Sequence, residues 1–116
     1  MRIDDLQVNA RDASLLLKAM SNERRLMILC HLAGGEKSVG QLEELISLSQ
    51  SALSQHLARL RRDRLVRTRR NAQSIYYSLN GTQAVAVMST LGSLYPAASA
   101  RGGGGAMATR LNACRD

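Results

Sequence analysis

SQSALSQHLARLRRDRLVRTRR, residues 49–70, is the stretch that decides the fold. It begins with small polar residues, continues with apolar residues at helical spacing and ends in arginine. Seven of the chain's fourteen arginines lie between Arg59 and Arg70, where the only acid is Asp63. A helix with a short polar start and a basic end can enter a DNA major groove, where its start reads base edges and its end holds phosphate.

The composition narrows the class of protein further. A chain of 116 residues forms one domain with a modest core. The formal net charge of +7 indicates an anionic partner, and its clustering favours nucleic acid over a membrane, although a solvated arginine face is the alternative. Phe and Trp are absent and only three Tyr occur, which disfavours single-strand binding by aromatic stacking.

Several classes are disfavoured by what the sequence lacks. No apolar run approaches the roughly 20 residues that cross a bilayer, and the N-terminus has no signal-peptide core, so we expect a cytoplasmic protein without a membrane partner. The cysteines Cys30 and Cys114 are then expected to be thiols. No nucleophile–base pair, phosphate loop or acidic metal cluster is visible, so we expect neither an enzyme nor a cofactor nor a metal site.

Apolar spacing and capping signals predict helices before the deciding stretch. The expected helices run from about Leu6 to Met20, from Ser21 or Asn22 to about Ala33, from the capping box of Ser38 and Gln41 to Ile46, and from Ser49 or Gln50 to Arg62. Leu53, Leu57 and Leu60 form the expected inner face of the last of these helices. Gly34 and Gly35 end the second helix because glycine accepts a left-handed backbone.

The pattern changes to period two after Asp63. It predicts two strands at 65–69 and 73–79, joined by a turn at 70–72. A last helix is expected from Gln83 to about Tyr95, ended by Pro96. Residues 97–116 contain four consecutive glycines and are predicted to form a flexible tail.

This order predicts a mainly α fold with a small β-hairpin, a winged helix-turn-helix over residues 1–96. The first and last helices carry apolar faces larger than so small a core needs. We therefore expect a homodimer built through these two helices.

Three motifs, LKAMSNERRL, LSQSALSQHLARLRRD and QSIYYSL, together resemble the ArsR/SmtB family of bacterial winged-helix regulators. The resemblance covers about Leu15 to Tyr95 and is strongest to the sulfide-, persulfide- and redox-sensing subgroup of the BigR/SqrR/HlyU type. It implies a homodimer that binds operator DNA and changes its affinity when it senses an inducer. It also places Arg64 where the family often has glycine, so a left-handed backbone there would be strained.

The chain departs from the family's sensing sites. Residues 38–42 lack the paired cysteines of metal sensors, and residues 83–95 lack His, Asp and Glu, so a metal-responsive repressor is a weak alternative. The sulfur-sensing members use two cysteines. Cys30 matches the first, Pro96 stands where the second usually follows, and Cys114 is a candidate substitute. The competing interpretation makes Cys30 a core residue and Cys114 an exposed tail thiol without function.

The expected function is a DNA-binding repressor whose affinity for its operator changes by thiol chemistry at Cys30. A DNA binder or antirepressor without a dithiol switch is the alternative. Two reading helices related by a two-fold axis lie about 34–36 Å apart, which predicts an imperfect inverted repeat in double-stranded operator DNA. The expected DNA contacts are Ser49, Gln50, Ser51, Ser54, Gln55, His56, Arg59 and Arg62 on the helix, and Arg67, Arg69, Arg70 and Gln73 in the wing.

Overall fold

The computed structural model describes residues 2–96 and places them in five helices and a three-stranded sheet. The elements are α1 (Ile3–Met20), α2 (Glu23–Ala33), β1 (Lys37–Ser38), α3 (Val39–Leu45), α4 (Gln50–Arg62), β2 (Val66–Asn71), β3 (Ser74–Leu79) and α5 (Gln83–Leu94). This order confirms the predicted winged helix-turn-helix. The predicted tail at 97–116 lies outside the described residues.

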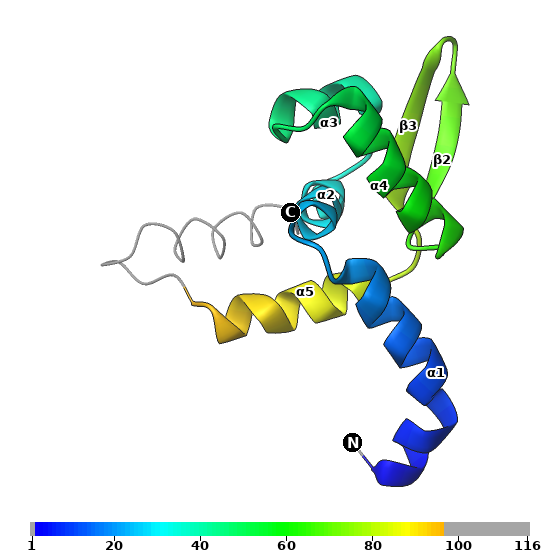
Figure 1. The fold of residues 1–116 in the computed structure, drawn as a ribbon, viewed down its shortest axis with the longest axis vertical. Helices are drawn as coiled ribbons and strands as arrows, with labels where there is room; N and C mark the ends of the chain where they lie inside the picture. The colour runs from blue at the N-terminus through cyan, green and yellow to red at the C-terminus, as the bar shows by residue number, and fades with distance from the viewer. Residues whose placement is uncertain (1, 97–116) are drawn as a thin grey trace.

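Helix α2 lies at the centre of the fold. It packs against α1, α4, α5 and β3 (Figure 1). The inner face of α4 consists of Leu53, Leu57 and Leu60, each at most 1% exposed, as the spacing predicted. Within residues 2–96, no helix is long and apolar enough to cross a membrane.

Side-chain caps start three of the helices where the sequence predicted them. Asn22 accepts hydrogen bonds from the backbone N–H groups of Arg24 and Arg25 at 2.9 and 3.1 Å. Ser38 and Gln41 form a capping box, and the hydroxyl of Ser49 accepts from the N–H of Ala52 at 3.2 Å. Each such cap is worth about 1 kcal/mol, because it satisfies a backbone donor that the helix leaves unpaired. Ser49 is therefore the cap of α4, and the helix itself begins at Gln50.

The prediction for the hairpin was wrong in two respects. The turn is formed by Ala72 and Gln73 and not by residues 70–72, because Asn71 still pairs with Ser74. Gln73 therefore lies in the turn instead of in a strand. Ala72 has a φ of 57°, which a two-residue hairpin turn can require at its first central position.

The sheet also contains a strand that the sequence did not predict. Strand β1 pairs antiparallel with β3, so the strand order is β1-β3-β2. Only two residues, Lys37 and Ser38, form β1. Two residues are too few to show a period-two pattern.

The chain leaves α4 through a left-handed residue. Arg64 has a φ of 63°, and the N–H groups of Arg64 and Leu65 donate to the carbonyls of Arg61 and Leu60 at 3.0 and 2.9 Å. This is the Schellman arrangement that usually places glycine at the position of Arg64. The amide of Asn80 donates to the Arg64 carbonyl at 3.0 Å, and the Asn80 N–H donates to the Leu65 carbonyl at 2.9 Å.

We predict that Arg64→Gly is more stable than Arg64→Ala by about 1 kcal/mol, because only glycine adopts this backbone without a Cβ clash. Both variants lack the arginine charge, so their difference isolates the backbone. Urea unfolding followed by circular dichroism measures it. Equal stabilities would show that Arg64 carries no strain. Arg61→Gly, inside the helix, is the control and should lose about 1 kcal/mol.

Candidate nucleic-acid interface

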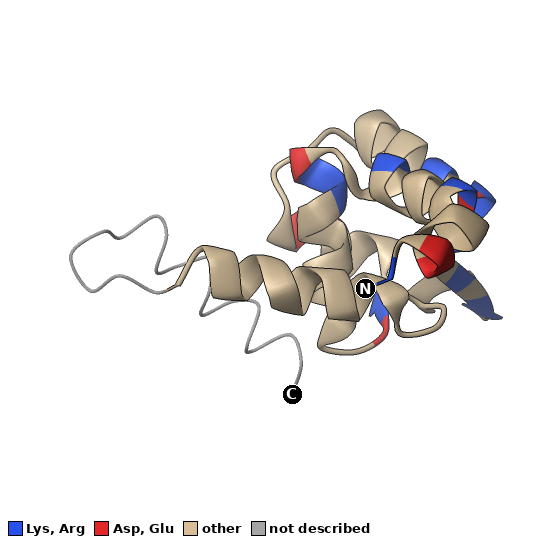
Figure 2. Cartoon of the chain, turned by 90° about the horizontal axis from the view of Figure 1, so that it is seen from below, with Lys and Arg blue, Asp and Glu red and all other residues tan. Residues whose placement is uncertain are grey.

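The positive charge of the described chain is concentrated on α4 and on the β2–β3 hairpin (Figure 2). Helix α5, in contrast, contains no charged residue. Burial of the leucine face turns the opposite face of α4 to solvent. The exposed predicted contacts of α4 are Gln50, Ser51, Ser54, Gln55 and Arg62.

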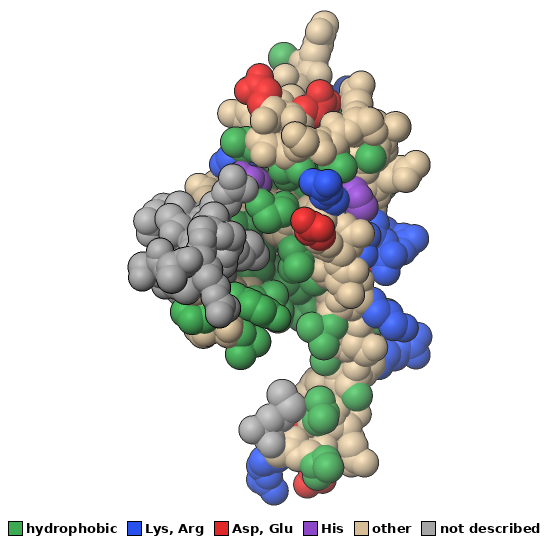
Figure 3. All heavy atoms as spheres, turned by 60° about the vertical axis from the view of Figure 1, so that its left-hand side comes forward, with side chains coloured by type: hydrophobic (Ala, Val, Ile, Leu, Met, Phe, Trp, Pro, Cys, Tyr) green, Lys and Arg blue, Asp and Glu red, His purple; other side chains and the backbone are tan. Residues whose placement is uncertain are grey.

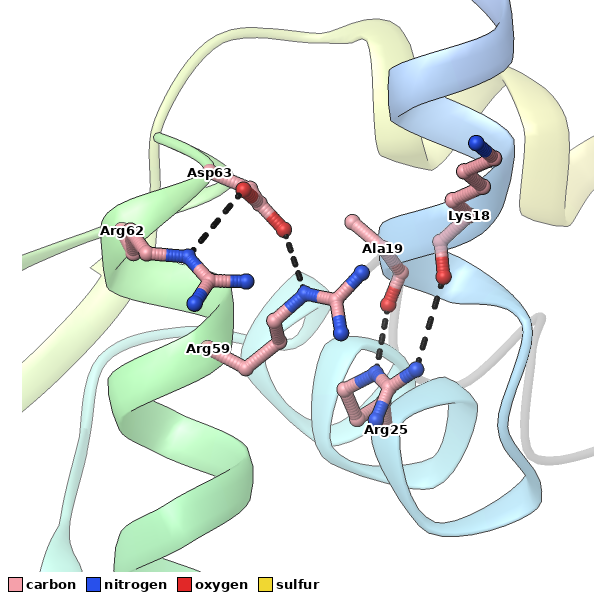
Figure 4. Close-up of polar contacts among 6 residues, drawn as sticks. All are labelled: Lys18, Ala19, Arg25, Arg59, Arg62 and Asp63. Atoms are coloured by element: carbon pink, nitrogen blue, oxygen red, sulfur yellow. Dashed lines mark hydrogen bonds and ion pairs between the residues drawn. The ribbon is translucent and has the colours of Figure 1, made fainter.

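The arginines at the basic end of α4 differ in their exposure and in their ion pairs. Arg59 Nε donates to Asp63 Oδ2 at 2.8 Å, and its side chain is 36% exposed (Figure 4). Arg62 is 69% exposed and lies 3.7 Å from the other carboxylate oxygen of Asp63. Arg61 is exposed and takes part in none of the ion pairs within residues 2–96. Arg61, which was not among the predicted contacts, is thus more available to phosphate than Arg59.

Arg25 connects α2 to the end of α1. Its Nε donates to the Ala19 carbonyl at 2.6 Å, and its Nη2 donates to the Lys18 carbonyl at 3.4 Å (Figure 4). The first bond gives the Ala19 carbonyl a partner at the end of the helix, and the Lys18 carbonyl also accepts from the Ser21 N–H at 3.2 Å. Burial lowers the pKa of Arg25, the positive charge of Arg59 lowers it further, and Asp63 opposes both effects.

His56 lies on the side of α4 that faces the start of α2. The side chain is partly buried, and burial is the main cause that lowers its pKa. The positive charges of Arg25 and Arg24 lower the pKa further. Both effects favour the neutral imidazole. A phosphate contact by His56 remains a prediction.

The register of the wing separates its arginines between two faces. Arg67 and Arg69 point to one face, and Arg70 lies on the other, because side chains alternate along β2. Arg69 donates from Nε and Nη2 to the two carboxylate oxygens of Glu36 at 3.0 and 2.7 Å. The hydrogen bond from Arg69 lowers the pKa of Glu36, and the same bond raises the pKa of Arg69. Arg69 is thus already paired, whereas Arg67 and Arg70 are exposed and outside the ion pairs of residues 2–96.

A cleft of about 450 Å³ lies between α4 and β3. Arg61, Arg62 and Ser54 line it from α4, and Tyr77 lines it from β3. Val39, Leu57 and Ala58 complete the lining. Two guanidinium groups beside polar hydroxyls suit a phosphate group of a DNA backbone.

Cys30 does not lie at a surface. It is 0% exposed and packs in the core with Ile28 and Leu29. Cys114 lies outside the described residues. No group of three or more His, Cys, Asp or Glu side chains that could hold a metal ion occurs among residues 2–96.

The comparisons with known proteins agree with this geometry. The profile described as "Bacterial regulatory protein, arsR family" matches residues 22–68. Transcriptional activator HlyU of Vibrio cholerae is 53% identical over 95 residues, which cover 82% of this chain and 88% of HlyU. The chain belongs to the arsR family of bacterial regulatory proteins.

Solved structures of this family share the fold. Reduced HlyU from Vibrio cholerae superimposes with a TM-score of 0.73 at 54% identity and covers 78% of this chain and 96% of HlyU. The transcriptional repressor BigR from Xylella fastidiosa gives a TM-score of 0.81 at 39% identity, with 84% of this chain and all of BigR covered. This arsR-family protein is therefore a DNA-binding transcriptional regulator.

We predict that the Cys30 thiol of the Cys114→Ser variant is shielded in the native protein. Ellman's reagent should modify it only as fast as the core opens, because a buried thiol reacts from the open state. In denaturant, one thiol per chain should titrate at once. Rapid reaction in the native state would show that Cys30 is accessible, and Cys30→Ala/Cys114→Ser provides the blank.

Proposed function

We propose that this regulator represses transcription in the cytoplasm by occupying an imperfect inverted repeat as a homodimer. The observation that carries the proposal is the exposed polar face of α4 beside an arginine-lined cleft. Its curated relatives include the transcriptional activator HlyU and the biofilm growth-associated repressor of Xylella fastidiosa. A regulator that occupies DNA excludes other proteins from the same site, so one mode of binding is compatible with either outcome.

We assign side chains to base edges or to phosphates by their exposure and by whether they are already paired within the protein. The first two turns of α4 read base edges through Gln50, Ser51, Ser54 and Gln55. Arg61 and Arg62 hold one DNA backbone at the cleft, and Arg67, Arg70 and Gln73 lie along the wing to follow phosphates or enter the minor groove. Ser49 serves the helix as its cap. Each phosphate contact releases counterions, so salt should weaken binding steeply.

Exposed apolar side chains support the homodimer. They occur on both α1 and α5 (Figure 3): Val8 and Leu15 lie on one side of α1, Leu94 and Tyr95 lie at the end of α5, and Ile3, Leu6 and Leu17 share the opposite face of α1. The solution structure of Mb0332 from Mycobacterium bovis, 26% identical with a TM-score of 0.66, is that of a homodimeric winged helix-turn-helix DNA-binding domain of a possible ArsR-family regulator. A two-fold axis through an interface of α1 and α5 would present two copies of α4 to successive turns of DNA.

Thiol control at Cys30 is the second candidate function. Its support is the position of Cys30 in α2, which packs against both α4 and α5. Any group added to this sulfur would displace neighbours in a close-packed core and so disturb both helices. The burial of Cys30 requires that the core open before a persulfide or oxidant reaches the thiolate. The thiol titration above measures that opening.

We predict that Gln55→Ala weakens binding to a specific duplex about tenfold or more, since a bidentate contact to a base is worth about 1–3 kcal/mol. The probe is a duplex enriched from a random-sequence library by the unmodified protein, and fluorescence anisotropy measures affinity. A scrambled duplex should bind Gln55→Ala as well as it binds the unmodified protein. Arg61→Gln is the contrast and should weaken both duplexes. Equal losses for Gln55→Ala on the two duplexes would exclude base reading.

We predict that Leu17→Asp separates the dimer into monomers and weakens binding to DNA. A carboxylate in an apolar interface is costly because it loses its hydration. Light scattering coupled to size exclusion measures the mass. Leu45→Asp is the matched control, since Leu45 is 47% exposed and Leu17 55% exposed, but Leu45 lies on α3 away from α1 and α5. A dimeric Leu17→Asp protein would place the interface elsewhere.

A further inference from the structure

The outer face of the wing holds an ion pair that the proposed function does not use. Arg69 Nε and Nη2 reach both carboxylate oxygens of Glu36, at 3.0 and 2.7 Å. The guanidinium carbon of Arg69 also lies 4.8 Å from the centre of the Tyr76 ring, within the range of a cation–π contact. A single exposed ion pair contributes little to stability, but a bidentate pair stacked on an aromatic ring has its geometry restricted.

This pair connects the two edges of the sheet. Arg69 belongs to the edge strand β2, and Tyr76 is its directly paired partner on the central strand β3. Glu36 immediately precedes β1 at the other edge. The Arg69 side chain therefore crosses the central strand and links residues 33 positions apart in the sequence. We call Glu36, Arg69 and Tyr76 the wing clamp.

The wing clamp and the cleft both include a side chain of β3. Tyr76 is part of the clamp, and its neighbour Tyr77 faces the opposite side of β3 and lines the cleft with Arg61 and Arg62. The hairpin extends beyond the helical body (Figure 1), while near its base β3 packs on α2 and α3 and pairs with β1 at Lys37 and Ser38. The position of Tyr77 relative to α4 thus depends on how firmly β3 is held.

We propose that Glu36 is a positioning residue for DNA binding. It retains Arg69 in the DNA complex, so the wing clamp keeps β3 at a fixed distance from α4, and Arg69 does not bind phosphate. This inference rests on the proposed function. Arg69 was expected to contact DNA, and the proposal instead gives it a contact within the protein.

The direction in which Glu36→Gln changes DNA affinity distinguishes a positioning role from a purely electrostatic one. Glu36 is a carboxylate near a surface that binds an anion, so electrostatics alone predict that its neutralisation strengthens binding. A positioning role predicts the opposite for Glu36→Gln. Glu44→Gln is the matched control, because Glu44 is exposed on α3 and takes part in none of the ion pairs of residues 2–96. It reports the effect of charge by itself.

The experiment uses the full chain and a duplex enriched by it from a random-sequence library. If no duplex is enriched, the proposed function fails before the clamp is tested. If one is enriched, anisotropy titrations at several salt concentrations compare Glu36→Gln, Arg69→Gln, the double variant and Arg67→Gln. Circular dichroism confirms that each variant is folded.

We expect Glu36→Gln and Arg69→Gln each to weaken binding severalfold, and the double variant to be no weaker than Arg69→Gln. The salt dependence of Arg69→Gln should equal that of the unmodified protein. Arg67→Gln, on the same face but unpaired, should reduce the slope of log K against log salt by about 1.8 per dimer if each copy loses one phosphate contact. Tighter binding by Glu36→Gln, or a reduced slope for Arg69→Gln, would overturn the proposal.

A charge exchange gives an independent test. Arg69→Glu should weaken binding strongly, and the added Glu36→Arg should restore most of it, since the exchanged pair can re-form across Tyr76 with the same net charge. If Arg69 contacts phosphate instead, Glu36→Arg acts only through its charge and should raise affinity equally in the Arg69→Glu and Arg69→Gln backgrounds, so a gain specific to Arg69→Glu identifies the re-formed pair. Failure to restore binding, or an equal gain in both backgrounds, would also overturn the proposal.

Discussion

Burial of the leucine face of α4 against the core is the constraint on which the rest of the structure depends. A helix has 3.6 residues per turn, so burying Leu53, Leu57 and Leu60 turns Ser51, Gln55 and Arg62 towards solvent. The same burial sets the position of α4 on α2, and α2 in turn carries α1 and α5. One apolar contact thus orients both the surface that faces DNA and the helices proposed to pair two copies.

The second organising principle is the small number of acids near the arginines. Asp63 holds Arg59, and Glu36 holds Arg69, while Arg25 is engaged by the last carbonyls of α1. These arginines stabilise junctions between elements. Arg61, Arg67 and Arg70 are in none of the ion pairs of the described residues and stay available to an external anion. A basic cluster in a sequence is therefore not a list of DNA contacts, because a nearby acid can engage an arginine within the protein, as Asp63 does with Arg59 and Glu36 with Arg69.

Local signals made much of this fold predictable. Helix starts at Asn22 and Ser38 follow from a polar side chain within three residues of the donor it satisfies. The left-handed backbone at Arg64 was expected only from the family resemblance, which often has glycine at that position. The missed features depend on partners distant in sequence or on too few residues. Strand β1 has two residues, and Arg69 meets Glu36 across 33 positions. The exposed face of α4 was predictable from periodicity, whereas the pairing of its arginines required the tertiary structure.

Asn80 joins the exit of α4 to the return of the wing, because it bonds the carbonyls of both Arg64 and Leu65. The wing is consequently a closed loop whose two ends are fastened at one point, directly before α5 begins. Lengthening a loop with fixed ends costs little entropy, since each doubling adds only about 0.6 kcal/mol. The tip of the wing can therefore gain or lose residues while the core and the outer helices keep their places. The distance that the wing reaches along a DNA groove can therefore differ among such regulators while the pairing of two copies stays the same.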